Sequence, residues 1–419
     1  MKLACTGFVS ATAGSTAGAN ALLINRLLEQ GFEIDFFSKP SFVDPRPVVG
    51  DRKGFRFFAV NNRILNSVRE KVETIPLIAT AAGTADSYSY NRLVVRTIRR
   101  EHRKQPYDLC LWLGDYARGS ITALPTISFA QGPPGTDARS VVARYREIRN
   151  LVGVKQALKW RLLTQLRLSR LGCPPLYHSD QFIVGSRQSA DTLVKLYSVD
   201  PARISILPYP VDLELFRPSS SSSSLKTGPL RVLWLGRIVP RKRLDLFLDG
   251  AAQAVKRGID LRLTLIGSSG FIPGYQAMVR SFAYPDRLEH RAAIDRKQVP
   301  ALFAHHDVLA QPSEEENFGS SVAEAQACGV PVIVGHSNGN ADYLSARDIQ
   351  LADDRPETFA EALAEVARRK LAGQMGEPAV SRSMAEKYFD IDRVTDRLVD
   401  VLQTVVKRKL GGSTLPVTS

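Results

Sequence analysis

The sequence predicts an α/β fold built from two units, each with a parallel β-sheet covered by helices. Three observations support this prediction. Short apolar runs alternate with longer amphipathic segments, which is typical of βαβ units. The alternation begins twice, once near Met1 and once near Leu230. The chain has 419 residues, a length that suits two domains of about 200 residues each.

In the first half, six short apolar runs have the length and composition of strands. We expect these strands at 2–9, 33–37, 56–60, 108–113, 125–129 and 181–185. A loop of small residues at 12–18 follows the first strand and leads into a helix over 20–30. Gly31 is a suitable residue to end that helix.

In the second half, the run Leu230–Leu235 is almost continuously apolar, as in a buried strand of a parallel sheet. In this half we expect strands at 230–235, 261–266, 307–311 and 331–334. The main helix is expected at 244–257. Six serines at 219–224 cannot build a core and predict a surface loop between the two halves. The amphipathic segment 380–409 is expected to be helical.

Composition excludes a fibrous or disordered chain, because 44% of the residues are hydrophobic and 23% are charged. Four dispersed cysteines form no metal-binding pair and suit a reducing cytoplasm; they are Cys5, Cys110, Cys173 and Cys328. The start of the chain lacks the apolar run of a signal peptide, and no stretch is long and apolar enough to span a membrane. We therefore expect a cytoplasmic protein.

The net charge of +14 is unevenly distributed. Residues 1–210 hold 29 Lys and Arg against 16 Asp and Glu, whereas residues 211–419 hold 27 against 26. A basic half predicts an anionic partner, which could be a membrane surface, a nucleic acid or a phosphorylated substrate.

Residues suited to catalysis or ligand binding are concentrated at 311–333. Three glutamates, Glu314–Glu316, are followed by Asn317-Phe318-Gly319 and by a helix that carries Glu324. The free N–H groups at a helix start can bind an anion, and a carboxylate such as Glu324 can accept hydrogen bonds from two vicinal ribose hydroxyls. An acidic surface loop beside a helix N-terminus would show the same spacing, so spacing alone leaves both interpretations open.

A second motif, Gly236–Lys242, directly follows the buried strand 230–235. Arg237 and Lys242 can converge on one anion, the arginine as a bidentate fork and the lysine as a point charge. A solvated basic loop is the alternative interpretation of this motif.

Together these motifs resemble a known family. Glu316 and Glu324 at their spacing, Phe318-Gly319 and Gly329-x-Pro331 resemble the signature of the retaining GT-B glycosyltransferases of family four, the glycosyl transferases group 1. Gly236-Arg237 with Lys242 resembles the family's other donor-site motif, and residues 207–218 resemble its inter-domain segment. The small-residue loop and first helix resemble its N-terminal opening, so the likeness covers nearly the whole chain.

The resemblance implies a GT-B fold, in which two Rossmann-like domains face each other across a cleft. We expect an N-terminal acceptor-binding domain over 1–210, a linker over 211–228, a C-terminal nucleotide-sugar-binding domain over 229–385, a helix over 386–410 that returns toward the N-terminal domain, and a tail over 411–419.

The resemblance also implies site residues. Glu316, Arg237 and Lys242 would be catalytic. Arg237 and Lys242 would bind the diphosphate, because cations can stabilise the charge that builds on a leaving nucleoside diphosphate without a metal. Glu316 would face the hydroxyls of the transferred sugar. The donor-binding set would be Gly18, Glu324, Asn317, Phe318, Gly319, Ser320, Ser321 and Gln131. No metal site and no resident cofactor are expected; the nucleotide-sugar, UDP- or GDP-linked, is a co-substrate. Configuration would be retained without a protein nucleophile.

Three departures from the family pattern stand out. Gln131 takes the place of the family's usual histidine, and it can hydrogen-bond a sugar hydroxyl but cannot titrate near neutral pH. Tyr209-Pro210 replaces Asn-Gly at the expected hinge. Asp342 stands where a glutamate is usual.

Two basic segments of the first half, 139–171 and 92–104, suit an anionic membrane surface and an acceptor that is lipid-linked or an oligosaccharide. A solvated helix face with a soluble acceptor is the alternative, and the absence of a nucleic-acid-binding motif argues against nucleic acid. The sequence therefore predicts a metal-independent, retaining hexosyl- or related glycosyltransferase of glycoconjugate biosynthesis, cytoplasmic and peripheral on the membrane. A nucleotide-sugar epimerase of the same architecture and a non-catalytic nucleotide-sugar-binding protein are the rival functions.

Overall fold

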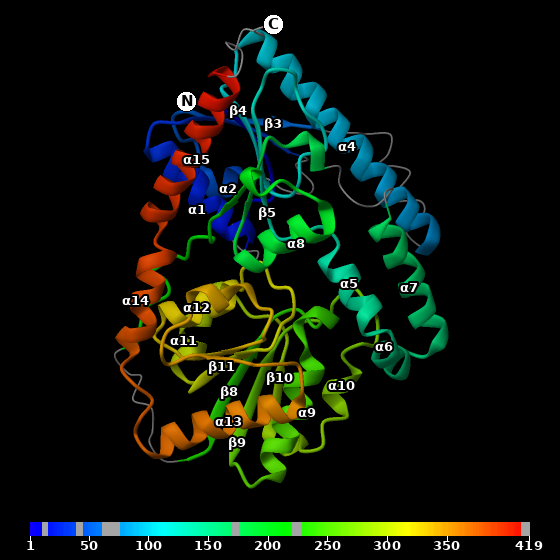
Figure 1. Cartoon of the computed structure of the whole chain (residues 1–419), viewed down its shortest axis with the longest axis vertical. Coiled ribbons are helices and arrows are strands. Elements are labelled where there is room, and N and C mark those ends of the chain that lie inside the picture. The colour runs from blue at the N-terminus through cyan, green and yellow to red at the C-terminus, as the bar shows by residue number, and fades with distance from the viewer. Residues whose placement is uncertain (11–15, 39–44, 61–75, 170–175, 220–227, 412–419) are drawn as a thin grey trace, which may run out of the picture.

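The structure, a computed structural model, describes residues 1–10, 16–38, 45–60, 76–169, 176–219 and 228–411. Two α/β domains form its two ends, and helices along both sides connect them (Figure 1). Most of the serine tract, Arg170, Cys173, most of the loop 12–18 and the tail beyond 411 lie outside the described residues.

Seven parallel strands form the sheet of the N-terminal domain, in the spatial order β3-β2-β1-β4-β5-β6-β7. The central strands are buried along their length, which explains their almost continuous apolar sequences. The strands are β1 Lys2–Gly7, β2 Glu33–Ser38, β3 Phe55–Ala59, β4 Leu109–Gly114, β5 Thr126–Ala130, β6 Gln181–Val184 and β7 Ile204–Ile206. The helices are α1 Thr16–Glu29, α2 Arg46–Val49, α4 Pro76–Lys104, α5 Thr136–Ala143, α6 Tyr145–Val152, α7 Val154–Leu168 and α8 Arg187–Tyr197.

Six parallel strands form the second sheet, in the order β10-β9-β8-β11-β12-β13. The strands are β8 Leu230–Leu235, β9 Leu261–Ile266, β10 Leu288–Arg291, β11 Val308–Gln311, β12 Val332–Val334 and β13 Ile349–Gln350. The helices are α9 Leu244–Lys256, α10 Ala277–Arg280, α11 Val299–Ala304, α12 Ser320–Ala327 and α13 Pro356–Leu371, with the 3₁₀ turns η3 Pro240–Lys242, η5 Arg296–Gln298 and η6 Gly339–Tyr343.

Two parallel-sheet α/β units confirm the predicted fold class. Three short strands were not predicted: β7, β10 and β13. Each lies at the edge of its sheet, where a strand has one neighbour and needs no long apolar run.

The C-terminal segment returns to the N-terminal domain as two helices rather than the single predicted one. The first is α14 Pro378–Tyr388 and the second is α15 Ile391–Gly411. The break between them buries Phe389. α15 packs against α1, where Arg26 and Asp392 form an ion pair at 2.6 Å.

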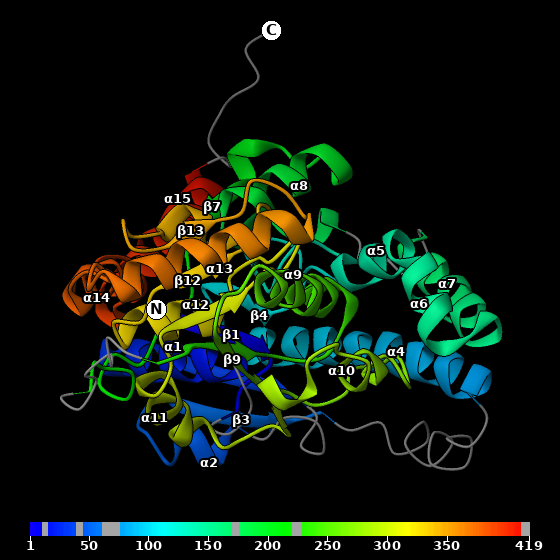
Figure 2. The ribbon, with the colours of Figure 1, turned by 90° about the horizontal axis from the view of Figure 1, so that it is seen from below.

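Helices α5, α6 and α7 form a helical arm between β5 and β6. The arm belongs to the first half of the chain but lies along the C-terminal domain, on the side of the molecule away from α14 and α15 (Figures 1 and 2). Val141, Ile148 and Ala157 of the arm join the apolar core of the C-terminal domain. The rings of Trp160 and Phe271 lie 5.5 Å apart. The arm therefore fastens the two domains together.

In the described ranges, no helix combines the length and the apolar character that crossing a bilayer requires.

Candidate active site

Glu316 is buried in the loop after β11, and two cations hold it. Lys242 Nζ donates to Glu316 Oε2 at 2.6 Å, and Arg241 Nη1 donates to the same oxygen at 2.8 Å. Both cations come from η3, the turn that follows β8. Burial alone raises the pKa of Glu316, but Arg241 and Lys242 outweigh burial and lower the pKa to about 2. Glu316 is thus a carboxylate at neutral pH and cannot donate a proton.

Arg237 lies further out than the sequence motif suggests. Its side chain is 59% exposed, and its guanidinium is 3.8 Å from the carboxylate of Asp137. Arg241 occupies the inner position instead, because it donates to Glu316 and, through Nε, to Asp137 at 2.8 Å. The 3₁₀ turn at Pro240 brings Arg241 and Lys242 to the same carboxylate, a feature that residue spacing did not reveal.

Asp137 is a second residue that the sequence interpretation missed. It lies in the first turn of α5 in the helical arm, so it reaches the site from the first half of the chain. Burial raises the pKa of Asp137, but Arg241 and Arg237 outweigh burial and lower it. The site thus holds three cations, Arg237, Arg241 and Lys242, around two carboxylates. Burial lowers the pKa of Lys242, and Glu316 opposes that shift.

The N-terminus of α12 adjoins this group of charges. A Cβ added at Gly319 would lie 2.6 Å from Asn340 Oδ1 and 3.5 Å from Glu316 Cγ, so a larger residue would displace the Asn340 side chain. The Gly319 N–H donates to Asn340 Oδ1. The N–H groups of Ser320 and Ser321 donate to no other described residue, so they are free to bind an anion.

Glu324 is buried on α12, eight residues after Glu316, and Arg296 of η5 pairs with it at 2.7 Å. Burial raises the pKa of Glu324 to about 7, while Arg296 opposes the shift. Arg296 itself lies over the ring of Phe216, 5.1 Å from its centre. Arg296 therefore orients Glu324, and the carboxylate titrates close to neutral pH.

Asn317 and Phe318, predicted to bind the donor, contact the N-terminal domain with their side chains. Asn317 Oδ1 accepts from the Gly185 N–H at 2.9 Å. Asn317 Nδ2 donates to the Ala130 carbonyl at 3.3 Å. Phe318 is buried against Tyr209, at a ring distance of 6.0 Å. Their side chains hold the domains together, and the backbone of this segment leads to the free N–H groups of α12.

Two predicted residues lie on the N-terminal domain. Gly18 is in the first turn of α1, which begins at Thr16, earlier than predicted. Gln131 is exposed directly after β5, and its Nε2 lies 3.2 Å from a Cβ added at Gly114. The structure does not place either residue in contact with the cations of η3.

Residues 217–381 match the family model described as glycosyl transferases group 1. The C-terminal domain belongs to this family. A D-inositol 3-phosphate glycosyltransferase from Mycobacteroides abscessus is 30% identical over 207 residues, which are 46% of this chain and 46% of the relative. The chain thus spans about half the length of such curated relatives.

Solved structures match over nearly the whole chain. Sucrose-phosphate synthase from Thermosynechococcus elongatus has a TM-score of 0.67 at 18% identity and covers 97% of this chain and 99% of its own. HepE from Anabaena, in complex with UDP and glucose, has a TM-score of 0.61 at 14% identity, with 96% and 99% covered. These likenesses confirm the predicted GT-B fold.

Two of the departures noted in the sequence face the junction between the group 1 domain and the N-terminal domain. Asp342 of η6 accepts from the Arg187 N–H, at the start of α8, at 2.9 Å. Tyr209 stacks on Phe129 of its own domain, with ring centres 4.6 Å apart, and its ring lies 6.0 Å from that of Phe318 in the group 1 domain. Both residues contribute to the contact between domains.

The other two loop glutamates of the group 1 domain bind the helical arm. Glu314 accepts from Arg144 at 2.8 Å. Glu315 accepts from Arg139 Nε at 2.9 Å, and its backbone has the left-handed φ of 47°. Arg139 and Arg144, two cations of the basic segment 139–171, are therefore paired with glutamates within the molecule. Among the described residues, no group of three metal-ligand side chains lies close enough together to hold an ion.

Proposed function

We propose that this protein is a glycosyltransferase that moves a sugar from a nucleotide-sugar to an acceptor hydroxyl, with retention of configuration, in the synthesis of a polysaccharide, glycolipid or other glycoconjugate. One observation carries the proposal: Arg241 and Lys242 converge beside the free N-terminus of α12, in a group 1 domain.

The chemistry of such a transfer fits these residues. When the bond between sugar and phosphate breaks, negative charge grows on the leaving diphosphate. Lys242, Arg241 and the N–H groups of Ser320 and Ser321 can stabilise that charge without a metal ion, and one such donor is typically worth on the order of 100-fold in rate. Glu316 keeps the two cations in place and offers its carboxylate to hydroxyls of the sugar. We propose attack from the same face as the leaving group and assign no protein nucleophile.

The nucleotide would lie along α12. Glu324 can accept hydrogen bonds from both ribose hydroxyls, and Arg296 favours the charged carboxylate that this task needs. We propose UDP or GDP as the nucleotide. HepE, a structural neighbour, was solved with UDP, so uridine is the first base to test.

The acceptor would bind to the N-terminal domain, which carries most of the positive charge. Curated relatives are named for a phosphorylated acceptor, and an anionic acceptor suits a basic domain. We propose an acceptor that is lipid-linked or an oligosaccharide, used at the cytoplasmic face of a membrane.

Two assays test the proposal. A thermal-shift screen of UDP-, GDP- and ADP-sugars should show one that raises the melting temperature, since a ligand that binds the folded state stabilises it. Incubating that nucleotide-sugar without acceptor should give slow hydrolysis only. Rapid conversion to another nucleotide-sugar would indicate an epimerase, and binding without turnover on any acceptor would indicate a binding protein. With an acceptor, NMR of the product should show the anomeric configuration of the donor, whereas inversion would exclude the proposed mechanism.

A further inference from the structure

We propose that helix α7 of the helical arm is a docking surface for an anionic phospholipid bilayer, and that a cavity between the middle of α7 and the junction of α5 and α6 binds the phosphate of a lipid headgroup. The link to a lipid-carried acceptor rests on the proposed function, but the surface itself does not.

α7 exposes a row of large apolar side chains. Val154, Leu158, Leu162 and Leu166 are each between 46% and 63% exposed. Their spacing of four residues places them on successive turns of one side of the helix. Ala157 and Thr164, on the opposite side, are buried against the body of the protein. Single exposed leucines are common on a protein surface, but a continuous row on one helix marks an interaction site.

Cations flank this row. α7 contains no Asp or Glu, and its charged residues are Lys155, Lys159, Arg161 and Arg167. Within the described residues, none of the four takes part in an ion pair. This distinguishes them from Arg139 and Arg144, which bind glutamates of the C-terminal domain. An exposed apolar stripe beside unpaired cations is the pattern of a helix that lies in the headgroup region of an anionic membrane.

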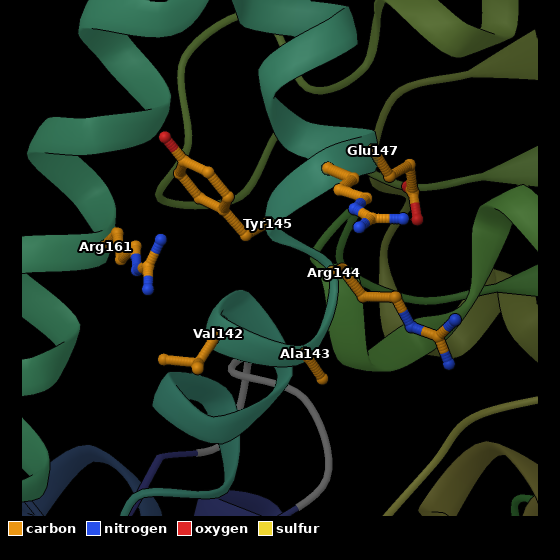
Figure 3. Close-up of a pocket in the computed structure, with 7 residues that line it drawn as sticks. Val142, Ala143, Arg144, Tyr145, Glu147 and Arg161 are labelled. Carbon is orange, nitrogen blue, oxygen red and sulfur yellow. The ribbon is translucent and has the colours of Figure 1, made fainter.

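A cavity of about 540 Å³ opens between the middle of α7 and the junction of α5 and α6, lined by residues 142–147 and Arg161 (Figure 3). The guanidinium of Arg161 stacks over the ring of Tyr145, 4.8 Å from its centre. Arg144 points away from Arg161 and toward the C-terminal domain, and Glu147 accepts from Tyr275 at 2.6 Å. Arg146 and Arg161 are exposed and form no ion pair within the described part of the chain, so each is a cavity cation available to a phosphate.

The positive charge of α7 favours an anionic bilayer over a protein as the partner. A protein partner or a second copy of the chain would need acidic groups facing α7, whereas a bilayer offers phosphates beside acyl chains over the whole length of the helix. The arm also lies at the side of the molecule in both views, so α7 can approach a flat surface (Figures 1 and 2).

Flotation of the full chain with vesicles tests the proposal. We expect it to float with vesicles of phosphatidylcholine that contain about 30% phosphatidylglycerol, and to be released by high salt. Serine at Leu158, Leu162 and Leu166 together should lower the bound fraction about tenfold, and R146Q/R161Q should lower it severalfold. Leu371→Ser and Arg393→Gln are matched controls, since Leu371 is an exposed leucine on α13 and Arg393 an exposed arginine on α15. Both controls should float like the parent chain.

The following outcomes of the flotation experiment and of size-exclusion chromatography would overturn the proposal. Equal flotation with pure phosphatidylcholine vesicles would remove the role of charge, and full flotation of both α7 variants would place any membrane contact elsewhere. If the leucine variant instead abolished self-association in size-exclusion chromatography, α7 would be an interface between copies of the chain. The thermal shift produced by the nucleotide-sugar is measured on the same variants and should not change. A chain that floats as expected but transfers no sugar would refute the proposed function and leave the docking surface intact.

Discussion

The carboxylate of Asp137 lies 2.8 Å from Nε of Arg241, and this contact joins the two halves of the molecule at the candidate active site. Asp137 comes from the helical arm, whereas Arg241 comes from the turn after β8. The same arginine holds Glu316 at 2.8 Å. In the proposed donor complex, a diphosphate would compete with Asp137 for this guanidinium.

Asp137→Asn should therefore bind nucleoside diphosphates more tightly. Without the carboxylate of Asp137, Arg241 and Arg237 are free to bind the diphosphate. We therefore expect Kd for UDP or GDP to fall about tenfold. Isothermal titration calorimetry measures this, with Asp191→Asn on exposed α8 as the control. Weaker binding by Asp137→Asn would show that Asp137 orients the cations and does not compete with the ligand.

Glu316→Gln should lower kcat/KM for sugar transfer about 100-fold, because Lys242 and Arg241 lose the carboxylate that holds them. Steady-state kinetics measures the change. Glu365→Gln, which removes a half-buried carboxylate on α13 that is paired with Arg368, should leave kcat/KM unchanged. A near-normal rate for Glu316→Gln would rule out its role in the site.

Arg241→Gln should lower kcat/KM more than Arg237→Gln does. The Arg241 side chain is 11% exposed and bonded to two carboxylates, whereas Arg237 is exposed and 3.8 Å from one. We expect about 100-fold for Arg241 and about tenfold for Arg237, measured with the same nucleotide-sugar. The reverse order would favour the assignment drawn from the sequence motif.

Nucleotide affinity should depend on pH through Glu324. Its pKa of about 7 means that the carboxylate becomes charged, and able to bind ribose, as the pH rises from 6 to 8. Affinity should increase over that range in the parent chain and be flat in Glu324→Gln. A pH dependence that survives the substitution would assign the titration to another group.

The same shift predicts the effect of Glu324 on folding stability. Its pKa is raised on folding from the usual value of about 4.3, so its contribution is present in full below that value and lost as the pH rises through 7. Chemical denaturation of the parent chain should thus show a loss of stability between pH 5 and 7.5 that is smaller in Glu324→Gln. An equal loss in both chains would contradict the assignment.

Arg139→Gln should lower the free energy of unfolding by about 1.5–3 kcal/mol, since it leaves the partly buried Glu315 without its partner. Adding Glu315→Gln should recover part of the loss. A double-mutant cycle by urea denaturation measures the coupling between the two residues. Strictly additive effects would show that this contact between the arm and the C-terminal domain contributes no stability.

The sequence was sufficient to predict the two parallel sheets because most of their strands are buried apolar runs, as in Leu230–Leu235. It was insufficient for three of the four edge strands, β7, β10 and β13, which are short and partly polar. It also could not show that the helical arm crosses to the C-terminal domain, because this depends on contacts such as Trp160 with Phe271, far apart in the chain.

For the site, the motif at 236–242 led to the correct turn but not to the inner cation. Arg241 and Arg237 are both arginines in one loop, and only the 3₁₀ turn brings Arg241 to Glu316. Asp137 carried no local signal, because it becomes part of the site only through the arm. Likewise, the basic segment 139–171 divides into residues paired inside the molecule and residues left on its surface, a division that composition cannot reveal.

The central claim is that Arg241 and Lys242 bind the diphosphate of a nucleotide-sugar. Calorimetric titration of UDP, UMP, GDP and GMP into the parent chain and into R241Q/K242Q tests it most directly. We predict that one diphosphate binds the parent chain at least about tenfold more tightly than its monophosphate, and that this difference disappears in the variant. Equal affinities for both phosphates in the parent chain, or an unchanged difference in the variant, would contradict the claim.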